Sequence, residues 1–331
     1  MGTMTSKTGM RAAKSMILLP LFATLAVCRA TSAGAQAYPS KPIRYIVPYS
    51  AGVLPDFVAR TIAPEMSAAL GQPIIVENRP SAGALVGYEF VAKQAGADGY
   101  TVASLLVQDL AILPLVVKDL RFDPQKDITP VIGLAEATLV FGSSITAPWK
   151  TMDEMVAVAR ANPGKFNHGG SSFNIRLSNL MLLQHLGLDL VYIPYTAGAA
   201  LLQAQLTGEV HAAFLPEANA ISFGERFRVL AVTSERRLAS FPNAVTTAEY
   251  GLPRIPSNSY ALGAPAGVPR PIIDRLHAAA SRALRQPEVR AQLEKRQLSI
   301  VEQSTEVAAK SLAEKGALYA ATAKRAGIEA Q

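Results

Sequence analysis

From residue 38 onward, the 331-residue sequence alternates short apolar runs with amphipathic stretches, with no low-complexity linker and no internal repeat. Apolar runs of strand length that alternate with helical periodicity are typical of α/β domains. Half of the residues are apolar, so a chain of this length can bury a sizeable core. We predict strands over residues 43–47, 74–77, 100–106, 131–141, 165–169, 190–195, 210–215, 229–233 and 260–264.

Helices are expected between these strands. Residues 56–70 place Val58, Ile62, Met66 and Leu70 on one face, and Gly71 is a natural stop. The pattern Thr-Met-Asp-Glu at 151–154 predicts a capping box and a helix that ends near residue 162. A further helix is expected over 175–186. The C-terminal part is mostly helical, and Pro271 and Pro287 mark helix starts.

The N-terminus has the pattern of a secretory signal. Lys7, Arg11 and Lys14 precede the apolar run 15–27, and small residues follow it. We expect residues 1–37 to be removed by cleavage near Ala37. The run is short for a membrane span, which needs roughly 20 apolar residues. Cys28, the only cysteine, lies inside this segment, so the mature protein is expected to have no disulfide and no cysteine metal site.

The charge balance excludes some classes of partner. The chain has 32 basic and 25 acidic side chains, a net charge of +7. Four of the basic residues (Lys7, Arg11, Lys14, Arg29) lie in the predicted signal, which leaves 28 against 25 and a net charge of +3. So weak and evenly spread a charge argues against binding nucleic acid or an anionic membrane surface.

Residues 48–60 follow the apolar run 43–47 and read as a strand that passes through a tight loop into a helix. The first turn of a helix has backbone N–H groups without an intrahelical partner and the positive end of the helix dipole. This segment is therefore a candidate site for a small anion. Asp56 has two compatible interpretations, as the helix N-cap or as an acceptor for a ligand hydroxyl, amine or water.

Nine sequence blocks resemble the receptor family of tripartite tricarboxylate transporters, also called the Bug family of periplasmic solute-binding proteins. They occur in family order and span the whole chain after the signal. The blocks are YPSKPI (38–43), PYSAG (48–52) with Asp56, ENRP (77–80), DGYT (98–101), FDP (122–124) with Asp127, PGKFN (163–167), IPY (193–195), AVTS (231–234) and APAGVP (264–269).

The resemblance implies an α/β fold of the type II periplasmic binding protein kind, a Venus flytrap with two lobes joined by crossover strands. Lobe 1 would be residues 38–138 plus 259–331, and lobe 2 would be 139–258. Such a receptor captures a small organic acid between its lobes and delivers it to the membrane components of the transporter. The resemblance also implies a monomeric protein that is located in the periplasm and binds no cofactor or metal.

The resemblance also implies which residues bind the ligand. The first half-site is the loop 49–56, in which Val53 and Leu54 replace family glycines, and the second is the glycine- and serine-containing run 168–176. Arg176 departs from the family. It is interpreted either as a solvated arginine at a helix start or as a bidentate guanidinium ligand for a carboxylate. Tyr195 reads as a packing residue or a ligand contact. The expected contacts are Tyr49, Ser50, Ala51, Gly52, Leu54, Asp56, Ser81, Ala82, Gln108, Ser171, Ser172, Asn174, Arg176 and Tyr195.

The sequence contains no recognisable catalytic pattern. The four histidines, His168, His185, His211 and His277, lack metal-ligand spacing, and neither a nucleophile elbow nor a phosphate-binding loop is present. These observations favour a receptor over an enzyme. A sensor partner of a membrane histidine kinase is an alternative, and a periplasmic hydrolase a more distant one. The loss of family glycines suggests a tighter, more apolar cleft for a monocarboxylate or aromatic acid rather than citrate.

Overall fold

The computed structural model describes residues 1, 38–195, 198–252 and 255–330, and only the backbone of Ala82. The predicted signal, its cleavage site and Cys28 lie outside the described residues. The chain divides into the units Met1–Ser40 and Lys41–Gln331, and the elements below belong to the second. Among the described residues, no helix is both long and apolar enough to cross a membrane.

The first part of this unit is built on a six-stranded sheet. Strand β1 lies parallel to both β2 and β3, whereas β11 runs antiparallel between β3 and β4. The order is β12-β4-β11-β3-β1-β2. The strands are β1 (Ile43–Val47), β2 (Ile74–Asn78), β3 (Thr101–Leu106), β4 (Ile128–Ala137), β11 (Asn258–Pro265) and β12 (Leu298–Gln303).

Two groups of helices pack against this sheet. One joins α1 (Leu54–Leu70) with α8 (Arg270–Leu284) and α9 (Pro287–Lys295), and the other joins α3 (Val107–Val116) with α10 (Thr305–Arg325). A short helix, α2 (Leu85–Glu89), continues as a π-helical turn over Phe90–Gln94. The predicted apolar face of α1 is buried, and the helix ends at Gly71 in the left-handed conformation, with φ 70°.

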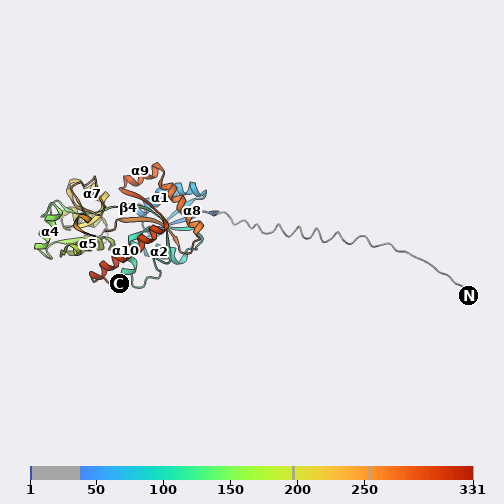
Figure 1. The fold of residues 1–331 in the computed structure, drawn as a ribbon, viewed down its shortest axis with the longest axis horizontal. Helices are drawn as coiled ribbons and strands as arrows, with labels where there is room; N and C mark the ends of the chain where they lie inside the picture. Colours follow the sequence, from blue (N-terminus) through green and yellow to red (C-terminus); the bar gives the residue numbers. More distant parts are fainter. Residues whose placement is uncertain (2–37, 196–197, 253–254, 331) are drawn as a thin grey trace. The chain divides into compact units, whose positions relative to one another are not determined.

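The second part contains a four-stranded sheet of order β10-β9-β5-β8 and a parallel pair, β6 and β7. Figure 1 shows α4, α5 and α7 at one end of the unit and α1, α8 and α9 at the other, with β4 between them. The strands are β5 (Leu139–Ser144), β6 (Asn167–Gly170), β7 (Val191–Pro194), β8 (Ala213–Pro216), β9 (Phe227–Val232) and β10 (Val245–Thr246). The helices are α4 (Met152–Ala161), α5 (Phe173–Leu186), α6 (Gly198–Thr207) and α7 (Glu217–Phe223).

The prediction of one strand over 131–141 was wrong. This stretch is the end of β4 and the start of β5, which belong to different sheets and meet at Thr138. The residues on both sides of the break are buried, so the apolar pattern runs on although the chain passes from one sheet to the other. Strands β10 and β12 were not predicted, because one has two residues and the other lies among helices.

The predicted capping box of α4 is only half present. The Thr151 side chain accepts a hydrogen bond from Glu154 N at 3.2 Å, as expected. The Glu154 carboxylate, however, accepts from Lys150 N at 2.6 Å instead of from the N-cap N–H. A complete capping box forms at Thr246 and Glu249, which the sequence reading did not single out.

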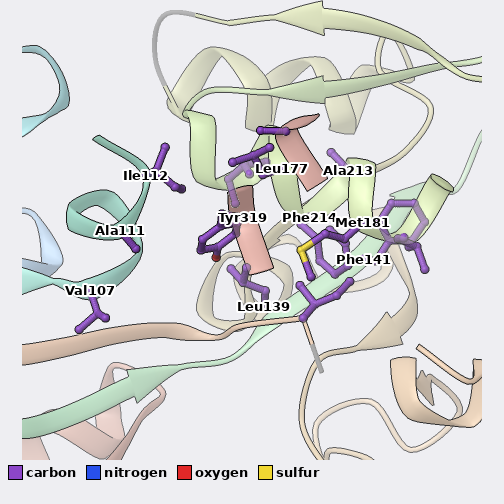
Figure 2. Close-up of a cluster of buried hydrophobic side chains, with 14 of the residues drawn as sticks. Val107, Ala111, Ile112, Leu139, Phe141, Leu177, Met181, Ala213, Phe214 and Tyr319 are labelled. Atoms are coloured by element: carbon purple, nitrogen blue, oxygen red, sulfur yellow. The ribbon is translucent and has the colours of Figure 1, made fainter. Parts of the chain in front are cut away.

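One hydrophobic cluster extends across both parts. Tyr319 of α10 lies between Ala111 and Ile112 of α3 on one side and Phe214 and Met181 on the other (Figure 2). These side chains are almost fully buried. A continuous core of this kind fixes α3 and α5 as neighbours, and the candidate site lies along these two helices.

Candidate functional site

A cavity of about 800 Å³ lies along α3 and the start of α5. Its volume is in the range of small-molecule sites, which are mostly apolar with a few polar groups. The six-stranded-sheet part contributes Tyr49, Ser81, Gly83, Ala84, Asp109, Ile112, Leu113 and Val116. The other part contributes Gly170, Ser171, Ser172, Phe173, Arg176, Tyr192, Pro194 and Tyr195.

Six of the fourteen expected contact residues line this cavity, and seven do not. Of Ala82 no side chain is described. The six are Tyr49, Ser81, Ser171, Ser172, Arg176 and Tyr195, whereas Ser50, Ala51, Gly52, Leu54, Asp56, Gln108 and Asn174 lie outside the lining. Asp109 was not among the expected contacts, and the apolar lining from α3 was missed because those positions have the pattern of a helix core.

The start of α1 is occupied by the protein's own carboxylate. Asp56 accepts hydrogen bonds from Gly52 N at 2.8 Å, Asn78 Nδ2 at 2.8 Å and Arg60 Nε at 3.0 Å. Burial acts to raise the pKa of Asp56, but these donors outweigh it and hold the pKa below its ordinary value. The N-cap interpretation was wrong, because Val53 is the N-cap and Asp56 lies inside the first turn.

Gln108 and Asn174 hold neighbouring segments together. Gln108 Oε1 accepts from Ser259 N at 2.9 Å, and its amide nitrogen donates to the Ser257 carbonyl. Asn174 Nδ2 donates to Asn258 Oδ1 at 2.6 Å, and its Oδ1 accepts from the Tyr319 hydroxyl at 3.0 Å. Both side chains are buried. They position the start of β11 relative to α3 and α5 and have no polar group left facing the cavity.

The start of α5 presents a cation instead. Ser172 caps the helix by accepting from Ile175 N at 3.3 Å, and Arg176 follows in the first turns. The Arg176 guanidinium carbon lies 4.6 Å from the centroid of the Tyr192 ring. Its Nε is buried without a hydrogen-bond partner, and no described acidic side chain pairs with it.

His168 adds no charge to this wall at physiological pH. It is buried beneath the site, with its ring centroid 5.2 Å from that of Tyr192. Burial first, and the nearby Arg176 charge second, lower the pKa of His168 to about 4. The imidazole is therefore neutral at physiological pH, and Arg176 and the helix dipole provide the positive charge of this wall.

The opposite wall carries an acid at the end of a hydrogen-bonded chain. Leu106 N donates to the Tyr88 hydroxyl at 3.0 Å, the hydroxyls of Tyr88 and Tyr49 are 3.0 Å apart, and the Tyr49 hydroxyl donates to Asp109 Oδ2 at 3.1 Å. Burial raises the pKa of Asp109 to about 6, although the Tyr49 hydrogen bond acts to lower it. No described basic side chain forms an ion pair with Asp109.

The cavity thus combines an apolar lining with one guanidinium and one carboxyl group on opposite walls. Such a site can bind a small organic ion by charge and shape. Among the described residues, no group of histidine, cysteine and acidic side chains is arranged to hold a metal ion.

Solved structures identify the class of protein. A TctC solute-binding protein from Polaromonas, solved without ligand, is 26% identical, has a TM-score of 0.75 and covers 87% of this chain and 99% of its own. A protein of Rhodopseudomonas palustris solved with adipate is 26% identical, with a TM-score of 0.74 and coverage of 89% and 100%. The predicted fold class, the two-lobed α/β fold of periplasmic binding proteins, is confirmed.

Sequence comparison then identifies the family. The family profile described as "Tripartite tricarboxylate transporter family receptor" matches residues 58–327. Protein BugT of Bordetella pertussis is 32% identical over 264 residues, which cover 77% of this chain and 80% of that protein. The chain belongs to the tripartite tricarboxylate transporter receptor family, as its sequence blocks predicted.

Proposed function

We propose that the protein is a periplasmic receptor that captures a small carboxylate-bearing metabolite in the cavity and delivers it to the membrane components of a tripartite tricarboxylate-type transporter. The unpaired Arg176 carries this proposal. A buried guanidinium Nε without a partner is costly, and a ligand carboxylate would supply the missing acceptor in bidentate geometry. The start of α5 adds the positive end of its dipole at the same place.

The lobes in this proposal are residues 38–138 plus 259–331 and residues 139–258. The passage from β4 to β5 at Thr138 and the start of β11 at Asn258 support these limits. Closure of the lobes would exclude water and strengthen each polar contact with the ligand. Export by the signal 1–37 and a monomeric receptor belong to the same proposal.

The charges favour a monocarboxylate over citrate. One guanidinium faces the cavity, and Asp109 on the opposite wall would repel additional carboxylates at neutral pH. The expected apolar character does not come from Val53 and Leu54, which lie outside the lining. It comes from Ile112, Leu113 and Val116 of α3. The relative that was solved with adipate shows that organic acids suit this fold.

The test is a calorimetric and melting-temperature screen of the mature protein with mono-, di- and tricarboxylates, aromatic acids and amino acids. A ligand at about 100 times its Kd stabilises the fold by about 2.7 kcal/mol. We expect Arg176→Gln to weaken acid binding by roughly 100-fold, the usual scale for truncating one partner of a buried charge pair. Arg282→Gln, which changes an exposed arginine on α8, is the matched control.

Absence of any saturable response at millimolar concentrations would contradict the receptor proposal. Equal affinity of Arg176→Gln and the unaltered protein would contradict the role of Arg176. Delivery is tested separately, by pull-down from membranes with and without the identified acid. Recovery of the transporter components is expected, whereas recovery of a histidine kinase alone would contradict transport.

A further inference from the structure

Within the described parts of the chain, no basic side chain forms an ion pair with the carboxyl group of Asp109. Its Oδ2 accepts from the Tyr49 hydroxyl, and no hydrogen bond from a described residue reaches its Oδ1. The side chain is half-buried and lines the cavity together with Arg176. A charge that is partly removed from water is costly unless a hydrogen-bonded partner compensates it. Here that partner has to come from the cavity.

The hydrogen-bonded chain from Tyr88 through Tyr49 determines which chemical group can pair with Asp109. Leu106 N–H donates to the Tyr88 hydroxyl, so the Tyr88 proton is free to point to Tyr49 and the Tyr49 proton to Asp109. Each member then donates towards the carboxyl group, which is left as an acceptor. Asp109 also lies in the first turn of α3, where the helix dipole favours its charged form. An acceptor of this kind suits an ammonium group.

Several other side chains that line the cavity are apolar. Ile112, Leu113 and Val116 follow Asp109 along α3, and Phe173 and Tyr192 face the cavity from the other part. These side chains can cover a hydrocarbon or aromatic segment but offer few hydrogen bonds. A ligand that satisfies both charged residues therefore carries an ammonium group and a carboxylate group on an apolar body.

We propose that the ligand is a zwitterion, an apolar amino acid whose carboxylate pairs with Arg176 and whose ammonium group pairs with Asp109. This inference rests on the proposed receptor function and names the substrate class of the same cavity. The competing possibility is that a protonated Asp109 donates to a second carboxylate of a diacid. The experiment below separates the two.

The test is calorimetry on the mature protein at pH 7.5 with matched pairs of ligands: phenylalanine with 3-phenylpropionate, leucine with 4-methylpentanoate, 6-aminohexanoate with hexanoate, and adipate with hexanoate. For at least one amino-bearing pair we expect the amine to increase affinity by tenfold or more, the scale of a close charge pair in a binding site. Asp109→Asn should abolish this advantage, and the affinity for the desamino acid should stay equal or rise, because a negative charge that repels carboxylates has been removed from the cavity.

Asp119→Asn, at an exposed aspartate just after α3, is the control and should keep the advantage. The melting temperature of each variant without ligand reports on folding. If the amine gives no advantage in any pair, or if Asp109→Asn keeps the advantage, the zwitterion proposal is wrong. A preference for adipate over hexanoate that Asp109→Asn removes would overturn it in favour of a diacid. If no acid binds at all, the receptor proposal itself has failed.

Discussion

Two helix starts in this protein look alike in sequence and differ in the charged side chain that lies near them. Both α1 and α5 follow a strand through a short loop that contains serine, and glycine lies in the loop before α1 and at the end of the strand before α5. At α1 the Asp56 carboxylate accepts from the loop, and only Tyr49 of the segment 49–56 reaches the cavity. At α5 the cap is a neutral serine and the nearest charge is Arg176, without an acidic partner among the described residues.

The difference shows that strand-loop-helix geometry alone does not define an anion site. The positive end of a helix dipole attracts an anionic ligand only when no carboxylate of the protein already lies there. Asp56 places a negative charge at the start of α1, whereas the start of α5 has the neutral cap Ser172 and the cation Arg176. Substitutions that change the charge at these positions should therefore alter stability at α1 and ligand binding at α5.

The largest effect is expected from Asp56→Asn. Asp56 is almost fully buried and accepts from three donors, one of them a guanidinium. Loss of its charge should lower the free energy of unfolding by about 3 kcal/mol, the upper end of the range for a hydrogen bond to a charged group. Denaturant titration measures this change, with Asp98→Asn at an exposed ion pair as the control.

The Asp56 effect should depend on pH in a defined direction. The folded-state pKa of Asp56 lies below its ordinary value of 3.8, so its contribution is present above about pH 4 and is lost as the pH falls through the folded pKa. The difference between the two proteins should therefore shrink below pH 4. A stability difference that stays constant to pH 2 would assign the effect to packing instead.

A smaller effect, on binding, is expected from Ser172→Asp. Aspartate is a good N-cap, and it would place a carboxylate at the start of α5 near Arg176, which reproduces the arrangement of α1. We expect acid affinity to fall by about 30-fold, because the added carboxylate would repel the ligand, while the melting temperature stays equal or rises, because aspartate caps as well as serine and complements the helix dipole. Ser172→Asn is a cap of the same shape without charge and should retain binding. Equal loss in both variants would point to a steric cause.

The smallest effect is expected from Asp109→Asn on stability. Its pKa is raised from 3.8 to about 6, so the stability associated with this group is complete below about pH 4 and is lost as the pH rises through 6. Removing the charge should therefore stabilise the protein by about 1.5 kcal/mol at pH 8, after allowance for partial exposure, and leave it unchanged at pH 4. Thermal unfolding at the two pH values measures this. Destabilisation at pH 8 would mean that Asp109 has a structural role.

Features that depend on neighbouring residues could be predicted from the sequence, whereas features that depend on residues far apart in the chain could not. Strand β1, the buried face of α1 and the family blocks depend on neighbouring residues, and periodicity and motifs report them directly. The change of sheet at Thr138 involves no turn residue, so the apolar pattern passed over it. Gln108 and Asn174 were expected to contact the ligand, but they form hydrogen bonds with residues about 150 and 84 positions away in the chain.

The sequence by itself determined the α/β class, the family and the two loop-to-helix segments, because these depend on local patterns of apolar, small and capping residues. Only the tertiary structure decided which helix start carries a carboxylate of the protein itself. The buried Asp56 side chain accepts from Gly52 in the loop and from Asn78 on the next strand. The tertiary structure also brought Asp109 and Arg176, 67 positions apart in the sequence, into the lining of one cavity. Charge pairing through space has no period in the chain, and this is why the chemistry of the cavity emerged only from the fold.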